Sequence, residues 1–176
     1  MTRTGVTLAA LLACACTPTV HHLEPYRSDP AAAEALEQRA QAVCTRARRA
    51  TPPHHFTTDG CSMWPDDGWV QCCVEHDIAY WCGGTSADRE QADAVFRDCV
   101  SAAHGTAVAW LMYCAVRVGG GPWQPLPWRW AYGWDCCRGY DAPTEAEPAP
   151  RVEGADRAGR QTCPESRPGT NARQSR

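Results

Sequence analysis

Twelve cysteines in a chain of 176 residues are the feature that most constrains its fold. Cysteine at this density is typical of small exported proteins stapled by disulfides, because the reducing cytosol keeps thiols free unless they bind metal. The net charge of −3 argues against a nucleic-acid-binding protein, since such domains usually present a basic face. No apolar run approaches the roughly 18 residues of a membrane-spanning helix. The composition therefore predicts a small exported protein, either disulfide-stapled or metal-rich.

Residues 1–16 have the features of a secretory signal, with Arg3 at the start, a short apolar run and small residues before the first cysteine. The sequence Leu11-Leu12-Ala13-Cys14 resembles a bacterial lipobox, in which the cysteine carries the lipid. Cleavage before Cys16 would instead leave an even number of other cysteines, so the lipidation site is Cys14 or Cys16, and an ordinary signal peptide is the alternative. We expect an exported protein, either a cell-envelope lipoprotein anchored by its N-terminal lipid or a secreted protein.

The rest of the chain divides into three parts. Residues 17–42 read as a polar tether and the start of an Ala-, Glu- and Arg-rich helix expected over residues 31–50. Residues 43–140 are expected to form the domain, and residues 141–176 have the composition of a disordered tail. Within the domain, apolar residues at helical spacing predict helices over residues 70–82, from the cap at Thr85 or Ser86 to at least Ala103, and over residues 107–118.

Two of these helices are joined only by Gly83-Gly84 and a capping residue, so they must fold back as an antiparallel pair. If the turn is centred between Gly84 and Thr85, facing residues have numbers that sum to about 169. His76 then lies opposite Asp93, and Cys72 lies within one turn of Cys99, which predicts a disulfide between them. Tyr80 follows one helical turn after His76 on the same face.

This arrangement brings together groups that can do chemistry. A histidine held by a carboxylate is the usual general base, because the carboxylate fixes the tautomer and raises the basicity of the ring. Asp77 is rotated by about 100° from His76 and points toward the preceding loop, where turn carbonyls and a carboxylate suit Ca²⁺. The alternative is a structural ion pair between His76 and Asp93, with Asp77 simply solvated.

The residues that carry these predictions match a known family. Cys72-Cys73-Val74-Glu75-His76-Asp77-Ile78-Ala79-Tyr80 resembles the secreted phospholipase A2 signature Cys-Cys-x-x-His-Asp-x-Cys-Tyr. Asp93 with Cys99 six residues later resembles the second signature, and Asp59-Gly60-Cys61-Ser62 is similar to the calcium loop. The matched motifs lie between residues 59 and 99.

The resemblance implies a mainly α fold built on a disulfide-stapled antiparallel helix pair. In this chain an N-terminal helix precedes the pair, and a Trp/Pro-rich C-terminal extended segment follows it. It implies hydrolysis of the sn-2 acyl ester of glycerophospholipids presented in a membrane or micelle. His76 would activate water, Asp93 would hold His76, and Tyr80 would bind Asp93. Asp77 would bind Ca²⁺, which stabilises the oxyanion. The remaining calcium ligands would be the backbone carbonyls of Gly60, Ser62 and Trp64.

The sequence departs from the family pattern in two places. Ala79 and Ala92 replace two signature cysteines that form one disulfide in the family, so the bridge is lost as a pair. The stretch between the loop cysteine and the helix is shorter than usual and lacks the expected glycines. Asp66 or Asp67 is therefore an alternative source of a calcium ligand.

The remaining cysteines allow several pairings. Cys61 and Cys73 are further disulfide candidates. Cys82, Cys114 and Cys136-Cys137 are expected to fasten the Trp/Pro segment to the helices, while Cys44 pairs with Cys163 or stays free. A zinc site is the alternative use of the helical thiols, and its ligands would be Cys72, Cys73, His76 and Cys82.

The segment from Pro122 to Tyr140 alternates large aromatic residues. In an extended chain they would share one face, where they would cover the helices or, if exposed, meet a lipid interface. Packing over the helices is the favoured interpretation. The alternating residues are Trp128, Trp130, Tyr132 and Trp134.

The function predicted is calcium-dependent phospholipid hydrolysis. A catalytically silent module of the same fold that binds lipid or protein is the first alternative, and a purely structural envelope lipoprotein is the second. Binding of Ca²⁺ distinguishes the enzyme from the catalytically silent module, because the oxyanion formed in catalysis needs a counter-charge.

Overall fold

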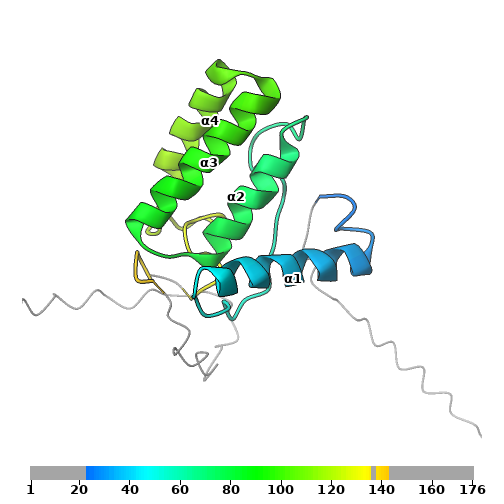
Figure 1. Cartoon of the computed structure of the whole chain (residues 1–176), viewed down its shortest axis with the longest axis vertical. Helices are drawn as coiled ribbons and strands as arrows, with labels where there is room; N and C mark the ends of the chain where they lie inside the picture. Colours follow the sequence, from blue (N-terminus) through cyan, green and yellow to red (C-terminus); the bar gives the residue numbers. More distant parts are fainter. Residues whose placement is uncertain (1–22, 136–137, 143–176) are drawn as a thin grey trace, which may run out of the picture.

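The computed structural model describes residues 23–135 and 138–142, and it is mainly helical over this range. Four helices, with no strand among the described residues, are arranged as Figure 1 shows. They are α1 (Pro30–Arg46), α2 (Val70–Cys82), α3 (Ser86–His104) and α4 (Thr106–Gly119). None of these helices has both the length and the apolarity needed to cross a bilayer. The predicted signal, Cys14, Cys16, Cys136, Cys137, Cys163 and the tail from residue 143 lie outside the described residues.

Helix α1 begins as its sequence predicts and ends early. The side chain of Asp29 caps the helix by accepting the backbone N–H of Ala31 at 2.9 Å, and Pro30 occupies the first turn. The predicted extension to Ala50 is wrong, because Arg48 has a positive φ of 55° that cannot continue a helix. Arg49 lies beyond the end of the helix, where its guanidinium donates to the carbonyl of Gly83 at 2.7 Å and pairs with Asp88.

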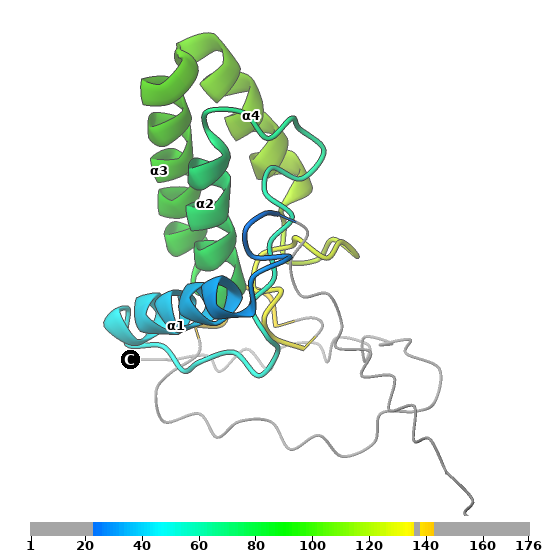
Figure 2. The ribbon, with the colours of Figure 1, turned by 90° about the vertical axis from the view of Figure 1, so that its right-hand side faces the viewer.

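The antiparallel pair formed by α2 and α3 is confirmed with the predicted register. Gly83 ends α2 with a φ of 71°, and Thr85 begins α3 with a capping box completed by Asp88. The disulfide between Cys72 and Cys99 ties the two helices at the far end from the turn. Helix α4 then folds back against α3, so the three helices stand side by side in both views (Figures 1 and 2).

Helix α1 crosses one end of this bundle, packing on α2 (Figure 2). A disulfide between Cys44 and Cys82 fastens the crossing, so the expectation that Cys44 pairs with Cys163 or stays free is wrong. Cys82 consequently does not fasten the Trp/Pro segment, and Cys114 is a free, exposed thiol. The core at this crossing consists of Leu36, Ala40, Cys44, Phe56, Val74, Ile78, Trp81 and Cys82.

The Trp/Pro segment is a series of turns and not an extended strand. Ala131 has a positive φ of 63°, which breaks the extended path, so the four alternating aromatics do not share one face. Trp130 and Trp134 are buried, while Trp128 and Tyr132 are only partly so. The indoles of Trp130 and Trp134 donate to the carbonyls of Gly84 and Cys82 at 2.9 and 3.0 Å. Packing over the helices is therefore confirmed for these two tryptophans.

Loss of the crossing disulfide should lower stability without changing the fold. The bridge spans a sequence separation of 38, so a double Cys44→Ala, Cys82→Ala variant should lose about 2–4 kcal/mol of unfolding free energy. Urea unfolding followed by circular dichroism measures this loss. Cys114→Ser is the control and should unfold like the wild type. An unchanged midpoint for the double variant would contradict the role assigned to the bridge.

Candidate active site

A cavity of about 370 Å³ lies between α2, α4 and the loop that precedes α2. Its walls are mostly apolar, and they include Phe96, Met112, Val116, Leu126 and Trp128. A volume in this range is typical of small-ligand pockets. The lining also contains most of the predicted site residues, namely Gly60, Ser62, Trp64, His76, Asp77 and Tyr80.

The predicted pairing of His76 with Asp93 is present behind the cavity wall. The Nε2 atom of His76 lies 2.8 Å from Oδ1 of Asp93, and the hydroxyl of Tyr80 donates to the same oxygen at 2.8 Å. The imidazole lies between the rings of Tyr80 and Phe96, with centroids 4.2 and 4.6 Å away. No described residue forms a hydrogen bond with Nδ1 of His76. This nitrogen is therefore left for a molecule in the cavity.

The electrostatics fix which nitrogen of His76 carries the proton. Burial alone would raise the pKa of Asp93, but hydrogen bonds from His76, Arg117 and Tyr80 outweigh it and leave that pKa below its usual value. An ionised Asp93 can only accept hydrogen bonds, so Nε2 of a neutral His76 must be the donor. Nδ1 then carries the lone pair, which is the state a general base requires.

Two arginines that the sequence analysis missed complete this network. Arg117 on α4 donates to Oδ2 of Asp93 at 2.7 Å, and Nε of Arg89 lies 3.8 Å from the same oxygen. Arg89 also donates to the hydroxyl of Tyr80 at 3.1 Å. The spacing of Arg89 four residues before Asp93 on one helix could have indicated the first contact. Only Gly105 separates α3 from α4, and Asp93 and Arg117 lie equally far from it, so the numbering argument used for α2 and α3 could have indicated Arg117.

Arg89 is anchored more firmly than Arg117. Its guanidinium donates to the hydroxyl of Tyr140 at 3.0 Å and to the carbonyls of Val116 and Arg117 at 2.9 and 2.8 Å. These carbonyls belong to the last turn of α4, and that of Val116 also accepts the backbone N–H of Gly120 at 2.9 Å. Arg89 therefore joins α3 to the end of α4, and its burial is compensated by hydrogen bonds.

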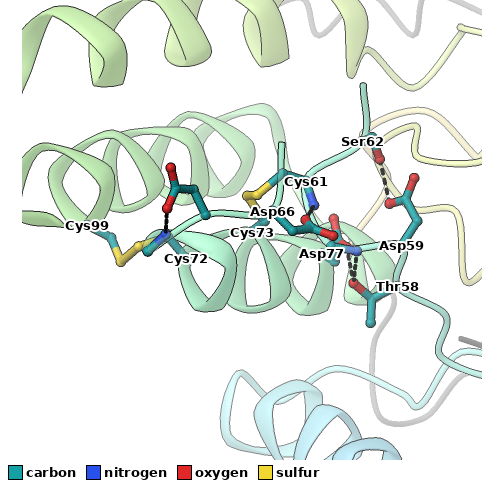
Figure 3. Close-up of a disulfide and its surroundings, with 12 residues drawn as sticks. Thr58, Asp59, Cys61, Ser62, Asp66, Cys72, Cys73, Asp77 and Cys99 are labelled. Atoms are coloured by element: carbon teal, nitrogen blue, oxygen red, sulfur yellow. Dashed lines mark hydrogen bonds between the residues drawn. A yellow bond between two sulfur atoms is a disulfide. The ribbon is translucent and has the colours of Figure 1, made fainter. Parts of the chain in front are cut away.

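The loop before α2 is fastened to the helix beside Asp77 (Figure 3). The disulfide between Cys61 and Cys73 joins loop and helix. The hydroxyl of Thr58 donates to Oδ2 of Asp77 at 2.6 Å and accepts the backbone N–H of Gly60 at 3.1 Å. Thr58 was not among the predicted site residues. It positions both the carboxylate and the glycine turn.

Asp77 is a carboxylate without a counter-charge. Burial raises its pKa well above the usual value, the hydrogen bond from Thr58 opposes this, and the charges of Asp59 and Asp66 raise it further. No Arg or His in the described part of the chain forms an ion pair with Asp77. A cation bound at this carboxylate would relieve the repulsion.

The loop beside Asp77 contains backbone oxygens of the kind that Ca²⁺ prefers. Among the described residues no group of three or more His, Cys, Asp or Glu side chains is arranged to hold a metal, so the ligands beyond Asp77 would be backbone oxygens. The carbonyls of Gly60, Ser62 and Trp64 accept no hydrogen bond from a described residue. Oxygen donors of this kind suit Ca²⁺.

The alternative side-chain ligands have other roles in the structure. Oδ1 of Asp66 accepts the N–H of Cys61 at 2.8 Å, and a Cβ at position 60 would overlap this carboxylate. Oδ1 of Asp67 accepts the N–H of Gly68 at 2.8 Å. The zinc interpretation is wrong, because Cys72, Cys73 and Cys82 are all in disulfides and offer no thiolate.

Comparison of the chain with protein-family models, with curated proteins and with solved structures found no match.

Removal of the charge on Asp77 should stabilise the calcium-free protein. Because its folded pKa lies above the unfolded value of about 3.9, ionisation of Asp77 costs stability as the pH rises through that range. With a chelator present, Asp77→Asn should raise the unfolding free energy at about pH 8, and the gain should vanish toward about pH 3. Urea titrations at several pH values measure this difference.

Added Ca²⁺ gives the same variant a second readout. Ca²⁺ should raise the melting temperature of the wild type and not that of Asp77→Asn, because only the former keeps the ligand. Asp98→Asn is the matched control, because Asp98 is exposed on α3 and pairs with Arg97, and it should respond like the wild type. Equal stabilisation of wild type and Asp77→Asn by Ca²⁺ would contradict the site.

Proposed function

We propose that this protein is a calcium-dependent hydrolase that cleaves an acyl ester of glycerophospholipids, at the sn-2 position by resemblance to secreted phospholipase A2. The observation that carries the proposal is that His76 and Asp77 both line a mostly apolar cavity, while an ionised Asp93 behind the wall pairs with His76. A general base, a cation ligand and space for an acyl chain are the parts that ester hydrolysis of a lipid needs.

The residues of the chain have defined tasks in this reaction. Nδ1 of His76 takes a proton from a water molecule as its oxygen attacks the ester carbonyl, and the imidazolium then donates that proton to the leaving alcohol. Asp93 stabilises the imidazolium through Nε2, while Tyr80 and Arg117 hold the carboxylate in place. Ca²⁺ held by Asp77 and loop carbonyls would supply the positive charge that stabilises the oxyanion.

The outer surface of α4, a helix that also lines the cavity, supports a lipid substrate. Helix α4 buries only Ala109 and Met112, and Trp110 and Leu111 are each 58% exposed. Residues 105–134, which include α4 and most of the Trp/Pro segment, contain none of the chain's 20 acidic residues. An exposed apolar surface without negative charge fits contact with a phospholipid layer better than contact with water alone.

Fatty-acid release from mixed phospholipid vesicles tests the reaction. The oxidised protein should release fatty acid with Ca²⁺ and not with chelator, and His76→Gln should lose about 10²–10⁴-fold in rate because the base is gone. Glu75→Gln is the matched control, since Glu75 is the neighbouring exposed residue and only pairs with Arg39 at the surface. It should keep the wild-type rate.

Each failure of this assay has a distinct meaning. No release by folded protein that binds Ca²⁺ would favour the catalytically silent binding module. Folded protein that neither binds Ca²⁺ nor changes with His76→Gln would favour the structural lipoprotein. Release that is insensitive to chelator would contradict the assignment of Asp77.

The apolar surface of α4 gives a second test. A Trp110→Ser, Leu111→Ser variant should release less fatty acid from vesicles by about tenfold or more, because each exposed apolar side chain adds membrane affinity. Its rate on a short-chain, water-soluble ester should stay unchanged. Val95→Ser is the control, because Val95 is 55% exposed on α3 and does not line the cavity. Equal losses on both substrates would contradict a lipid-contacting role.

A further inference from the structure

Asp93 has more partners than a histidine-orienting carboxylate needs. Its side chain is fully buried, and Oδ1 is shared by His76 of α2 and by Tyr80, one turn later on the same helix. Oδ2 is held from the opposite side by Arg117 of α4 at 2.7 Å. One carboxylate on α3 thus receives charged or polar groups from both neighbouring helices.

The two oxygens of Asp93 depend on different residues. Nε of Arg89 lies 3.8 Å from Oδ2, and four of its five N–H groups are used by Tyr80, Tyr140 and two carbonyls of α4. Arg117 is therefore the one close donor to Oδ2 among the described residues. Without it, Asp93 would lose the closest charged hydrogen bond that keeps it ionised, and a protonated Asp93 would donate to Nε2 of His76 and move the imidazole proton to Nδ1.

We propose that Arg117 is a positioning residue that locks the Asp93 carboxylate, so that neutral His76 keeps its proton on Nε2 and leaves Nδ1 free toward the cavity. The catalytic meaning of this lock rests on the proposed function. The lock itself is a property of the fold that can be measured without turnover.

The contacts of Arg117 distinguish it from an ordinary packing residue. Its side chain is 33% exposed, so it is not needed to fill the core, and its guanidinium donates to Asp93 from the edge of the bundle. An arginine holds a carboxylate in a more fixed direction than a lysine, because its N–H groups are planar. Arg89 performs the structural task of joining α3 to α4, so its replacement would not separate positioning from folding.

Imidazole ¹⁵N spectra of the intact oxidised protein, recorded where His76 is neutral, test the lock directly. The wild type should show the Nε2–H tautomer and a slowly exchanging Hε2 proton. In Arg117→Met, the two tautomers should mix and Hε2 exchange should accelerate by about tenfold or more, since Asp93 loses its closest cation and is protonated in part of the molecules. Arg117→Lys should restore part of the wild-type spectrum, because an ammonium group can still make one charged hydrogen bond.

The chain offers a matched control in Arg97. Its guanidinium pairs with Asp98 and stacks over Tyr113 of α4, and it does not reach Asp93. Arg97→Met should leave the spectrum of His76 unchanged. If Arg117→Met does not fold, Arg117→Gln replaces it, because glutamine keeps a donor but removes the charge, and it should also show mixed tautomers.

Kinetics then show whether the lock matters for turnover. Arg117→Met should lower kcat for fatty-acid release by about 10- to 100-fold with little change in KM, because misorientation of a base affects the chemical step and not substrate binding. An unchanged His76 spectrum in folded Arg117→Met or Arg117→Gln would overturn the proposal. If Arg117→Met shows mixed tautomers but the wild type has no hydrolytic activity, the result would support the lock and contradict the proposed function.

Discussion

The buried carboxylate of Asp93 is the group on which the rest of the site depends. A carboxylate at 0% exposure is stable only when its charge and its lone pairs are satisfied, and four side chains do this here. His76 and Tyr80 come from α2, Arg89 from α3 itself and Arg117 from α4. The requirement to satisfy one charge therefore fixes how three helices lie against one another, and the same contacts orient the imidazole.

The second carboxylate of the site is in the opposite electrostatic state. Asp77 has Thr58 as a hydrogen-bond donor and two acidic residues nearby, so its pKa is raised where that of Asp93 is lowered. The environments of Asp77 and Asp93 thus shift their pKa values in opposite directions. Opposed pKa shifts of this kind cluster at functional sites.

Disulfides hold these two environments in place. The Cys61–Cys73 bridge keeps the loop beside Asp77, and the Cys72–Cys99 bridge ties α2 to α3 beyond His76 (Figure 3). Adjacent cysteines on one helix therefore fasten it in two directions, one toward the loop and one toward the partner helix. The core clusters of the domain are small, and such domains commonly rely on cross-links for stability.

The sequence by itself determined the helix pair and its register. A two-glycine turn and a fixed rise per residue leave little freedom, so the pairing of His76 with Asp93 and of Cys72 with Cys99 could be predicted from numbering alone. Only the tertiary structure decided the contacts between segments that no short turn connects. The Cys44–Cys82 bridge and the hydrogen bond from Arg89 to Tyr140 belong to this group. How such segments pack against each other depends on contacts throughout the core, and the spacing of residues within one segment does not determine it.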